Sequence, residues 1–261
     1  MSVIYNEIGD NYDTTRKTDP HIAHKLAELI EIDPNKKYLD IACGTGNYTI
    51  ALNKLGGQWF GFDQSEKMLN EAKLKASSIT WSCFDVAELD YADEEFEGAI
   101  CSLAIHHFPN LDLAFAEIAR VLKPNSKLVI FTSTPEQMQH YWLTHYFPEM
   151  MKKSCAQMPS LASIKSSLTK HNLIVTKTEP FFINAQLKDF FLYSGKYQPE
   201  IYLSQNVRNG ISSFKNFCNE LELSHGLTKL KTDINSGAIN SLIQQSNDKS
   251  DYLFLVIQKT K

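Results

Sequence analysis

The sequence predicts an α/β fold in which a doubly wound, mostly parallel sheet of seven strands carries helices on both faces. Apolar strand-like runs alternate with helical patterns over about 115 residues, which is typical of a parallel sheet with crossover helices. Runs such as "AICSLAI" and "KLVIF" lack the polar alternation of a half-exposed strand, so we expect both faces to be covered. A chain of 261 residues can bury one large core, and we expect one large domain with a helical insertion in its C-terminal half.

The N-terminal part is expected to alternate helices and strands up to residue 76. A first helix follows Asp19-Pro20, because apolar residues recur there at helical spacing. The strand "QWFGFD" ends on Asp63, and Ser65 is a suitable N-cap for the helix that follows. In chain order we expect helix 21–32, strand 36–43, helix 47–56, strand 58–63 and helix 65–76.

The remaining strands continue the same alternation. The expected elements are strand 78–85, strand 97–105, helix 111–122, strand 126–134, strand 172–183 and strand 251–260. Helical segments rich in Phe, Tyr, His and Lys separate the last three strands. We expect a core built from residues 1–133, 171–184 and 250–261, with residues 1–18 as an N-terminal flap. Residues 134–170 and 185–249 are expected to form a helical lid over the functional edge of the sheet.

A glycine-containing turn, "CGTGNY", follows the first expected strand. Gly44 and Gly46 lack a Cβ, so the chain there can adopt positive φ and approach a ligand closely. Ligands of open α/β sheets bind beyond the carboxyl ends of the strands, where this turn lies. A dinucleotide-binding turn carries a third glycine, but Thr49 occupies that position. The turn alone therefore leaves open a dinucleotide or another nucleoside-bearing cofactor.

Five segments narrow that choice by their order and spacing. They are "LDIACGTGNY", "FGFDQSEKML", "CFDVAELD", "FEGAICSLAIHHF" and "IARVLKPNSKLVIF". With them, residues 12–133 resemble the class I S-adenosylmethionine-dependent methyltransferases, in particular the type 11 group. The opening "YNEIGDNYDTTRKTDPHI" is similar to the N-terminal segment of a subgroup assigned to natural-product pathways. The resemblance implies a Rossmann-like fold, S-adenosyl-L-methionine as cofactor and methyl transfer to a small-molecule acceptor.

The resemblance also implies roles for residues at the strand ends. Asp63 would accept hydrogen bonds from both ribose hydroxyls, and Asp85 one from the adenine amine. Helix capping and turn formation are the alternative uses of these two aspartates. Ala42 stands where most relatives carry glycine, which leaves the approach to the cofactor slightly less open. The expected cofactor-binding residues are Tyr12, Arg16, Ala42, Gly44, Gly46, Asp63, Gln64, Met68, Asp85, Val86 and Leu103.

Methyl transfer from a sulfonium is a direct displacement, which requires alignment and the exclusion of water but no metal. A general base helps when the acceptor must lose a proton. His106 and His107 follow the fourth expected strand and are the candidates for that role; alternatively, they cap the turn and pack under the sheet edge. The lid residues that are candidates for acceptor binding are His140, Tyr141, His145, Tyr193, Arg208 and Lys215.

Charge bears on the partner. Residues 1–133 carry 12 basic and 20 acidic side chains, whereas residues 134–261 carry 14 and 10. The basic excess of the second part weakly favours an anionic acceptor, and an ordinary solvated surface is the alternative. A net charge of −4 without a basic stripe disfavours nucleic acid. "SLAIHHF" also lacks the Asp/Asn-Pro-Pro-Tyr/Phe stretch usual in enzymes that methylate nucleobases.

Several other classes are disfavoured. The five cysteines are scattered without a C-x-x-C pair, so we expect neither a disulfide framework nor a metal site. No apolar run is long enough to span a membrane, and the N-terminus has no secretion signal, so we expect a cytoplasmic protein, monomeric or homodimeric. Two alternative functions remain: a catalytically silent S-adenosylmethionine-binding sensor or scaffold, and an NAD-dependent oxidoreductase.

Overall fold

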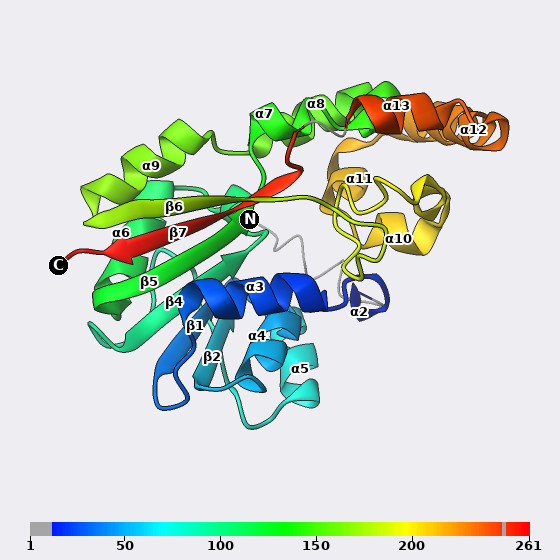
Figure 1. Cartoon of the computed structure of the whole chain (residues 1–261). Coiled ribbons are helices and arrows are strands. Elements are labelled where there is room, and N and C mark those ends of the chain that lie inside the picture. Colours follow the sequence, from blue (N-terminus) through cyan, green and yellow to red (C-terminus); the bar gives the residue numbers. More distant parts are fainter. Residues whose placement is uncertain (1–11, 247–248) are drawn as a thin grey trace.

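The computed structural model describes residues 12–246 and 249–261, which build one sheet with helices on both faces (Figure 1). Of the expected N-terminal flap, residues 1–11 lie outside the described residues. The strands are β1 (Lys37–Ile41), β2 (Gln58–Asp63), β3 (Thr80–Cys83), β4 (Phe96–Ser102), β5 (Leu122–Thr132), β6 (Leu173–Phe181) and β7 (Tyr252–Lys259).

The strand order is β3-β2-β1-β4-β5-β7-β6. Neighbours are parallel from β3 to β5, whereas β7 is antiparallel to both β5 and β6. The predicted α/β class and the seven-stranded, mostly parallel sheet are thus confirmed. The order reverses between β1 and β4, and this switch point is where open α/β sheets bind their ligands.

Helices cover the sheet and gather beyond the carboxyl ends of its parallel strands (Figure 1). The α-helices are α2 (Tyr12–Thr15), α3 (Pro20–Ile30), α4 (Asn47–Asn53), α5 (Glu66–Lys75), α6 (Leu111–Val121), α7 (Pro135–Met138), α8 (Pro148–Gln157), α9 (Leu161–Lys170), α10 (Gln205–Asn209), α11 (Ser212–Phe217), α12 (Glu220–Ser236) and α13 (Ile239–Gln245). The 3-10 turns are η1 (Ile105–His107), η2 (Trp142–His145) and η3 (Pro199–Leu203).

Local chemistry accounts for the helix boundaries. The Asp19 side chain accepts hydrogen bonds from the backbone N–H groups of His21 and Ile22, and Pro20 occupies the first helical position of α3. Ser65 caps α5 in the same way, by accepting from the N–H of Met68. The cap of α3 fixes the start of the helix that precedes β1, and the cap of α5 fixes the turn at the carboxyl end of β2.

Alternate residues of each strand pack on opposite faces of the sheet. Val129 and Phe131 of β5 belong to the buried cluster under α3 and α4, whereas Leu128 and Ile130 belong to the cluster under α6 and α9. This alternation follows from the two-residue period of a strand. Both faces are apolar because both are covered, as the continuous apolar runs predicted.

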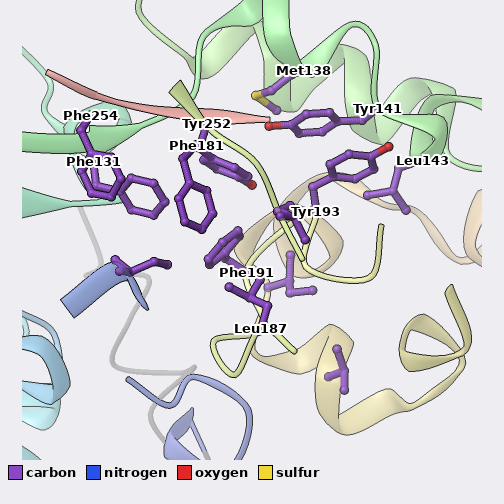
Figure 2. Packing of buried hydrophobic residues seen from close by; sticks show 14 of the residues in the cluster. Phe131, Met138, Tyr141, Leu143, Phe181, Leu187, Phe191, Tyr193, Tyr252 and Phe254 are labelled. Atoms are coloured by element: carbon purple, nitrogen blue, oxygen red, sulfur yellow. The ribbon is translucent and has the colours of Figure 1, made fainter. Parts of the chain in front are cut away.

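The expected lid segments share one of these clusters with the sheet (Figure 2). Phe131 and Phe254 of the sheet stack with ring centroids 4.6 Å apart, and Phe191 packs edge-on against Tyr252 at 4.7 Å. Further out, Tyr141 continues the same aromatic column. The segments after residue 134 are therefore fixed on the sheet by buried aromatic surface. Among the described residues, no helix has both the length and the apolar character needed to cross a membrane.

Candidate functional site

A cavity opens where the carboxyl ends of β1, β2 and β4 meet the segments that follow β5. The empty space between its walls, including the open mouth, is about 1540 Å³. We call the lining residues from the range 12–104 the N-terminal wall and those from 106–252 the C-terminal wall.

The turn between β1 and α4 carries two glycines that serve different purposes. Both have positive φ, 56° at Gly44 and 74° at Gly46. A Cβ built on Gly44 would meet nothing within 4 Å, and Gly44 faces the cavity. A Cβ on Gly46 would overlap the Trp81 ring, and Gly46 is not part of the described lining. Gly44 therefore leaves room for a ligand, whereas Gly46, expected to bind the cofactor, shapes the start of α4.

Asp63 is the last residue of β2 and points its carboxylate at the glycine turn. It accepts hydrogen bonds from the backbone N–H groups of Gly44, at 2.9 Å, and Ser65, at 2.8 Å. Burial raises the pKa of Asp63, and hydrogen bonds from the backbone N–H groups of Ser65, Gly44 and Gln64 oppose the rise. Asp63 also lines the cavity, so its carboxylate can accept further hydrogen bonds from a ligand bound there. The N-cap of α5 is Ser65, so capping does not account for Asp63.

Asp40, on β1, is a second buried carboxylate of the N-terminal wall and is not among the residues expected from the sequence. The Thr49 hydroxyl donates to its Oδ2 at 2.5 Å. Burial raises the pKa of Asp40 to about 7, since the Thr49 hydrogen bond offsets only part of the desolvation. Its place in "LDIACGTG", two residues before Ala42, was the signal available in the sequence.

Asp85, Val86, Gln64 and Met68 lie together on the same wall. Asp85 is exposed and accepts from the N–H of Ala87 at 2.9 Å, so it forms the turn after β3 as well as lining the cavity. Met68 and Val86 are buried and apolar. A carboxylate beside an apolar strip suits a flat ring that carries an amine.

Ala42 and Leu103 end β1 and β4 in an unusual backbone conformation. Both have a φ of 54°, in the left-handed region that favours glycine, and both line the cavity. This conformation costs roughly 1–2 kcal/mol for a residue with a Cβ. It also stops β4 at Ser102, three residues before the end expected from the apolar run. Backbone strain of this kind concentrates at functional sites.

Residues 12–16 contact both walls of the cavity. Arg16 Nε lies 2.6 Å from Asp189 Oδ1, and the Arg16 guanidinium lies 5.2 Å from the centre of the Tyr12 ring. Asp13 accepts from the Thr45 hydroxyl, at 2.6 Å, and from Lys75, also at 2.6 Å. Tyr12 and Arg16 thus lie on the N-terminal wall, and Asp189 on the C-terminal wall is a partner that the sequence did not reveal.

His106 and His107 lie on η1 and begin the C-terminal wall, with ring centroids 3.9 Å apart. Burial and the nearby Arg16 lower the pKa of His107 to about 4, and burial lowers that of His106 as well. His107 Nδ1 lies 3.3 Å from Gln157 Nε2 of α8. The buried Nδ1 of His106 has no hydrogen-bond partner among the described residues. Both rings are therefore neutral at pH 7.

The rest of the C-terminal wall mixes apolar and hydroxyl side chains. Its apolar residues include Phe108, Met138, Met158, Phe191, Leu192 and Ile211. Its hydroxyl-bearing residues are Thr132, Ser133, Ser154, Ser212, Ser213 and Tyr252.

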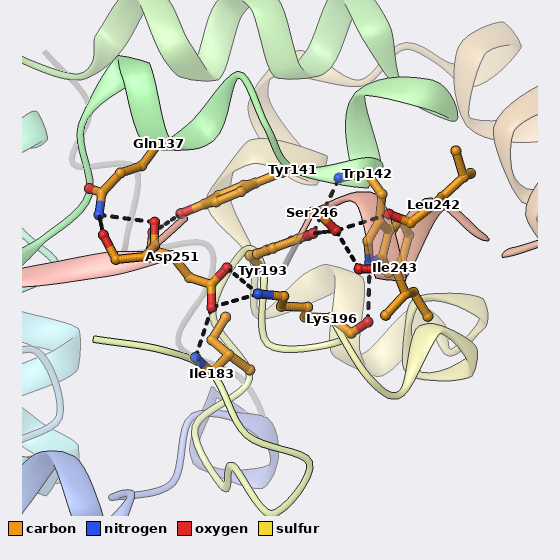
Figure 3. A network of polar contacts seen from close by, with 11 residues as sticks. Gln137, Tyr141, Trp142, Ile183, Tyr193, Lys196, Leu242, Ile243, Ser246 and Asp251 are labelled. Carbon is orange, nitrogen blue, oxygen red and sulfur yellow. Dashed lines mark hydrogen bonds and ion pairs between the residues drawn. The ribbon is translucent and has the colours of Figure 1, made fainter. Parts of the chain in front are cut away.

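None of the six expected acceptor-binding residues lies in the described cavity lining. Tyr141 and Tyr193 are buried against each other, with ring centroids 3.8 Å apart, and belong to the core (Figures 2 and 3). His140 is exposed and contacts Lys249, and His145 likewise contacts Lys229. Two basic residues complete the set outside the lining: Arg208, which donates to the carbonyl oxygen of Tyr202, and the exposed Lys215.

This fold and this site define a class of protein before any relative is considered. A doubly wound sheet with a buried aspartate at the end of β2 and a glycine turn after β1 is typical of nucleoside-cofactor binding. Residues 39–130 match the family model described as Methyltransferase domain. These residues therefore belong to the methyltransferase domain family, and the resemblance to the class I S-adenosylmethionine-dependent methyltransferases predicted from the sequence is confirmed.

Similarity extends beyond the matched domain. A protein of Anabaena variabilis, described as a methyltransferase from an antibiotic biosynthesis pathway, superposes with a TM-score of 0.83 at 28% identity, covering 92% of this chain and 98% of that one. Demethylmenaquinone methyltransferase of Bacillus mycoides is 29% identical over 51% of this chain, and the match spans 62% of that relative. Geranyl diphosphate C-methyltransferase of Streptomyces coelicolor, solved with S-adenosyl-L-homocysteine, shares the fold at 12% identity, with a TM-score of 0.58 and coverage of 92% and 75%.

Proposed function

We propose that the protein is an enzyme that transfers a methyl group from S-adenosyl-L-methionine to a small-molecule acceptor. One observation carries the proposal: a single cavity brings Gly44, Asp63 and Asp85 together with a second wall that holds two neutral histidines. The domain family supports the cofactor. The S-adenosyl-L-homocysteine bound to the fold relative of Streptomyces coelicolor supports it as well.

The N-terminal wall fits this cofactor by the chemistry of its side chains. The open acceptor sites of Asp63 would receive the ribose hydroxyls, and Asp85 would receive the adenine amine beside Met68. The Arg16 guanidinium has the planar donors that suit a carboxylate such as that of the methionine part. Ser102 also lines the cavity, and its buried hydroxyl has no partner among the described residues, so a bound ligand would satisfy it.

When bound, the cofactor supplies a methyl group activated by positively charged sulfur, so an acceptor lone pair bonds to that carbon as the sulfur–carbon bond breaks. The protein's contribution is to align the acceptor and exclude water. The apolar part of the C-terminal wall contributes to both the alignment of the acceptor and the exclusion of water. His106 is the residue we assign to hydrogen-bond an acceptor hydroxyl, because its Nδ1 has no partner among the described residues. Burial lowers the pKa of this ring well below its usual value, so it is a weak base at pH 7. Gln157 would hold the adjacent His107 ring in place.

The two alternative functions receive less support. An NAD-dependent oxidoreductase would bind a dinucleotide, and the turn that binds a dinucleotide carries a third glycine. Thr49 stands at that position, where it is buried on α4 and hydrogen-bonded to Asp40. A catalytically silent sensor needs no second reactant, yet the cavity has a second wall of apolar and hydroxyl side chains, which suits an acceptor.

Calorimetry with S-adenosyl-L-methionine and S-adenosyl-L-homocysteine tests the proposal on wild type and Asp63→Ala. Loss of two hydrogen bonds to a charged group should weaken binding roughly 100-fold. The matched control is Asp93→Ala, because Asp93 is 77% exposed and pairs with Arg120 away from the cavity. Equal affinity of wild type and Asp63→Ala, or no binding by wild type, would refute the proposed site, and NAD would then be titrated.

A further inference from the structure

The charged side chain that the described C-terminal wall carries is paired with a charged side chain of the N-terminal wall, and this bears on the chemistry of the acceptor. Among the described lining residues, Arg16 is the sole Lys or Arg, and Asp189 is the sole Asp or Glu of the C-terminal wall. These two side chains pair at 2.6 Å, with Arg16 16% and Asp189 2% exposed. Tyr48 also donates to Asp189, at 3.1 Å. The two charges cancel, and neither is left for an acceptor.

The titratable groups that remain on this wall add no charge. The imidazoles of His106 and His107 are neutral at pH 7, because burial and the nearby Arg16 disfavour the protonated ring. Tyr252 is also neutral, since burial raises its pKa. Every other polar contact the wall can offer comes from hydroxyl or amide groups, such as those of Ser133, Ser213 and Gln157.

We propose that the acceptor is an uncharged molecule with an apolar ring or chain and a hydroxyl or carbonyl group. This inference rests on the proposed methyltransferase function and specifies its substrate class. An acceptor carboxylate would be buried here without a cation, and an unpaired buried charge is costly. The apolar side chains, which include the adaptable Met138 and Met158, suit a flat or flexible hydrocarbon surface.

The inference departs from the weak sequence-based expectation of an anionic acceptor. That expectation rested on the basic excess of the second part of the chain. Arg208 and Lys215, the basic residues expected to meet the acceptor, lie outside the described cavity lining. The basic excess is thus a property of the surface rather than of this cavity.

A matched pair of probes tests the proposed substrate class. Protein saturated with S-adenosyl-L-homocysteine is titrated with 2-naphthol and with 6-hydroxy-2-naphthoate, which differ by one carboxylate. We expect 2-naphthol to bind at least about tenfold more tightly, because the carboxylate would lose its hydration without gaining a partner. Tighter or equal binding of the carboxylate, or no measurable binding of 2-naphthol, would overturn the inference.

Two variants make the test specific to the wall. Ser212→Lys places a cation at the C-terminal wall and should narrow or invert the preference, whereas Lys215→Gln, outside the lining, should leave it unchanged. A preference unaffected by Ser212→Lys would overturn the electrostatic explanation. Failure of S-adenosyl-L-homocysteine to bind would overturn the methyltransferase proposal itself, and with it this inference. A carboxylate preference with the cofactor bound would overturn the substrate class alone.

Discussion

Replacing Lys196 by Met should destabilise the protein strongly, because it would strand a buried carboxylate. Lys196 Nζ lies 2.9 Å and 3.1 Å from the two carboxylate oxygens of Asp251, and the side chains are 1% and 3% exposed (Figure 3). The backbone N–H of Ile183 also donates to Asp251, at 2.8 Å. Removing one partner of such a pair costs about 3–5 kcal/mol, since the remaining charge stays desolvated.

Urea unfolding of three variants separates charge from packing. Lys196→Met should lose about 3–5 kcal/mol of unfolding free energy at unchanged urea dependence. Lys196→Met combined with Asp251→Asn removes both charges and keeps an acceptor for Ile183, so it should recover most of that loss. The control Lys177→Met breaks a pair whose lysine is 55% exposed and should cost less than about 1 kcal/mol. A loss by Lys196→Met as small as that of the control, or no recovery in the double variant, would refute the reasoning.

This ion pair also holds part of the cavity in place. Asp251 precedes Tyr252, which lines the C-terminal wall, and the Tyr141 hydroxyl donates to the carbonyl oxygen of Asp251. The contacts of Lys196 and Asp251 therefore act on the C-terminal wall and not on Asp63 or the glycine turn. In the Lys196→Met variant that remains folded, we expect 2-naphthol binding to weaken and S-adenosyl-L-homocysteine binding to stay within about twofold.

Three further predictions concern the strand ends and the histidines. Burial raises the pKa of Asp40 from 3.8 to about 7. The contribution of Asp40 to the free energy of unfolding is therefore fully present below pH 3.8 and is lost as pH rises through 7. As pH rises from 4 to 8, the unfolding free energy of Asp40→Asn should therefore increase relative to that of wild type by up to about 4 kcal/mol, as measured by urea unfolding. A difference between the two proteins that stays constant with pH would contradict this. Gly46→Ala should destabilise the protein by at least about 2 kcal/mol, because the new Cβ would be strained and would overlap the neighbouring indole ring. Gly44→Ala should cost about 1 kcal/mol of stability but impair cofactor binding. Thermal unfolding measures the first effect and calorimetry the second. Because the pKa of His107 is about 4, its contribution to the free energy of unfolding is fully present above pH 6.5 and is lost as pH falls toward 4. An NMR titration of the His107 imidazole with a midpoint near pH 6.5 would disprove this.

The sheet was predictable because its strands are long apolar runs that only a covered strand can accommodate. β1, β2 and β5 all lie within or overlap the expected ranges, and the intervening helices carry recognisable caps such as Ser65. The early end of β4 was not predictable. Leu103 adopts a left-handed conformation that its residue type disfavours, and tertiary contacts such as the hydrogen bond from its N–H to Phe131 hold it there.

The location of the N-terminal wall was predictable because each of its parts is local. A strand and the turn that follows it are contiguous in sequence, so Asp63 and Gly44 could be placed at neighbouring strand ends without knowing the rest of the fold. Gly46 shows the limit of this reasoning. Its conformation follows from the turn, but its contact with Trp81 comes from β3 and leaves it outside the lining.

The C-terminal wall has no such local signature, and this explains why the expected acceptor residues lie outside the described lining. Asp189 reaches Arg16 across 173 positions, and Gln157 reaches His107 across 50. Such distant pairings decide whether an aromatic or basic residue of a helical insertion lies in the core, on the surface or in a cavity. Tyr141 is buried in the core, and Lys215 is exposed on the surface. Composition therefore pointed to an anionic acceptor, whereas Arg16, the one basic side chain of the described lining, is paired with Asp189. For a site assembled by long-range packing, the charge of the lining is informative about the ligand and the charge of the segment is not.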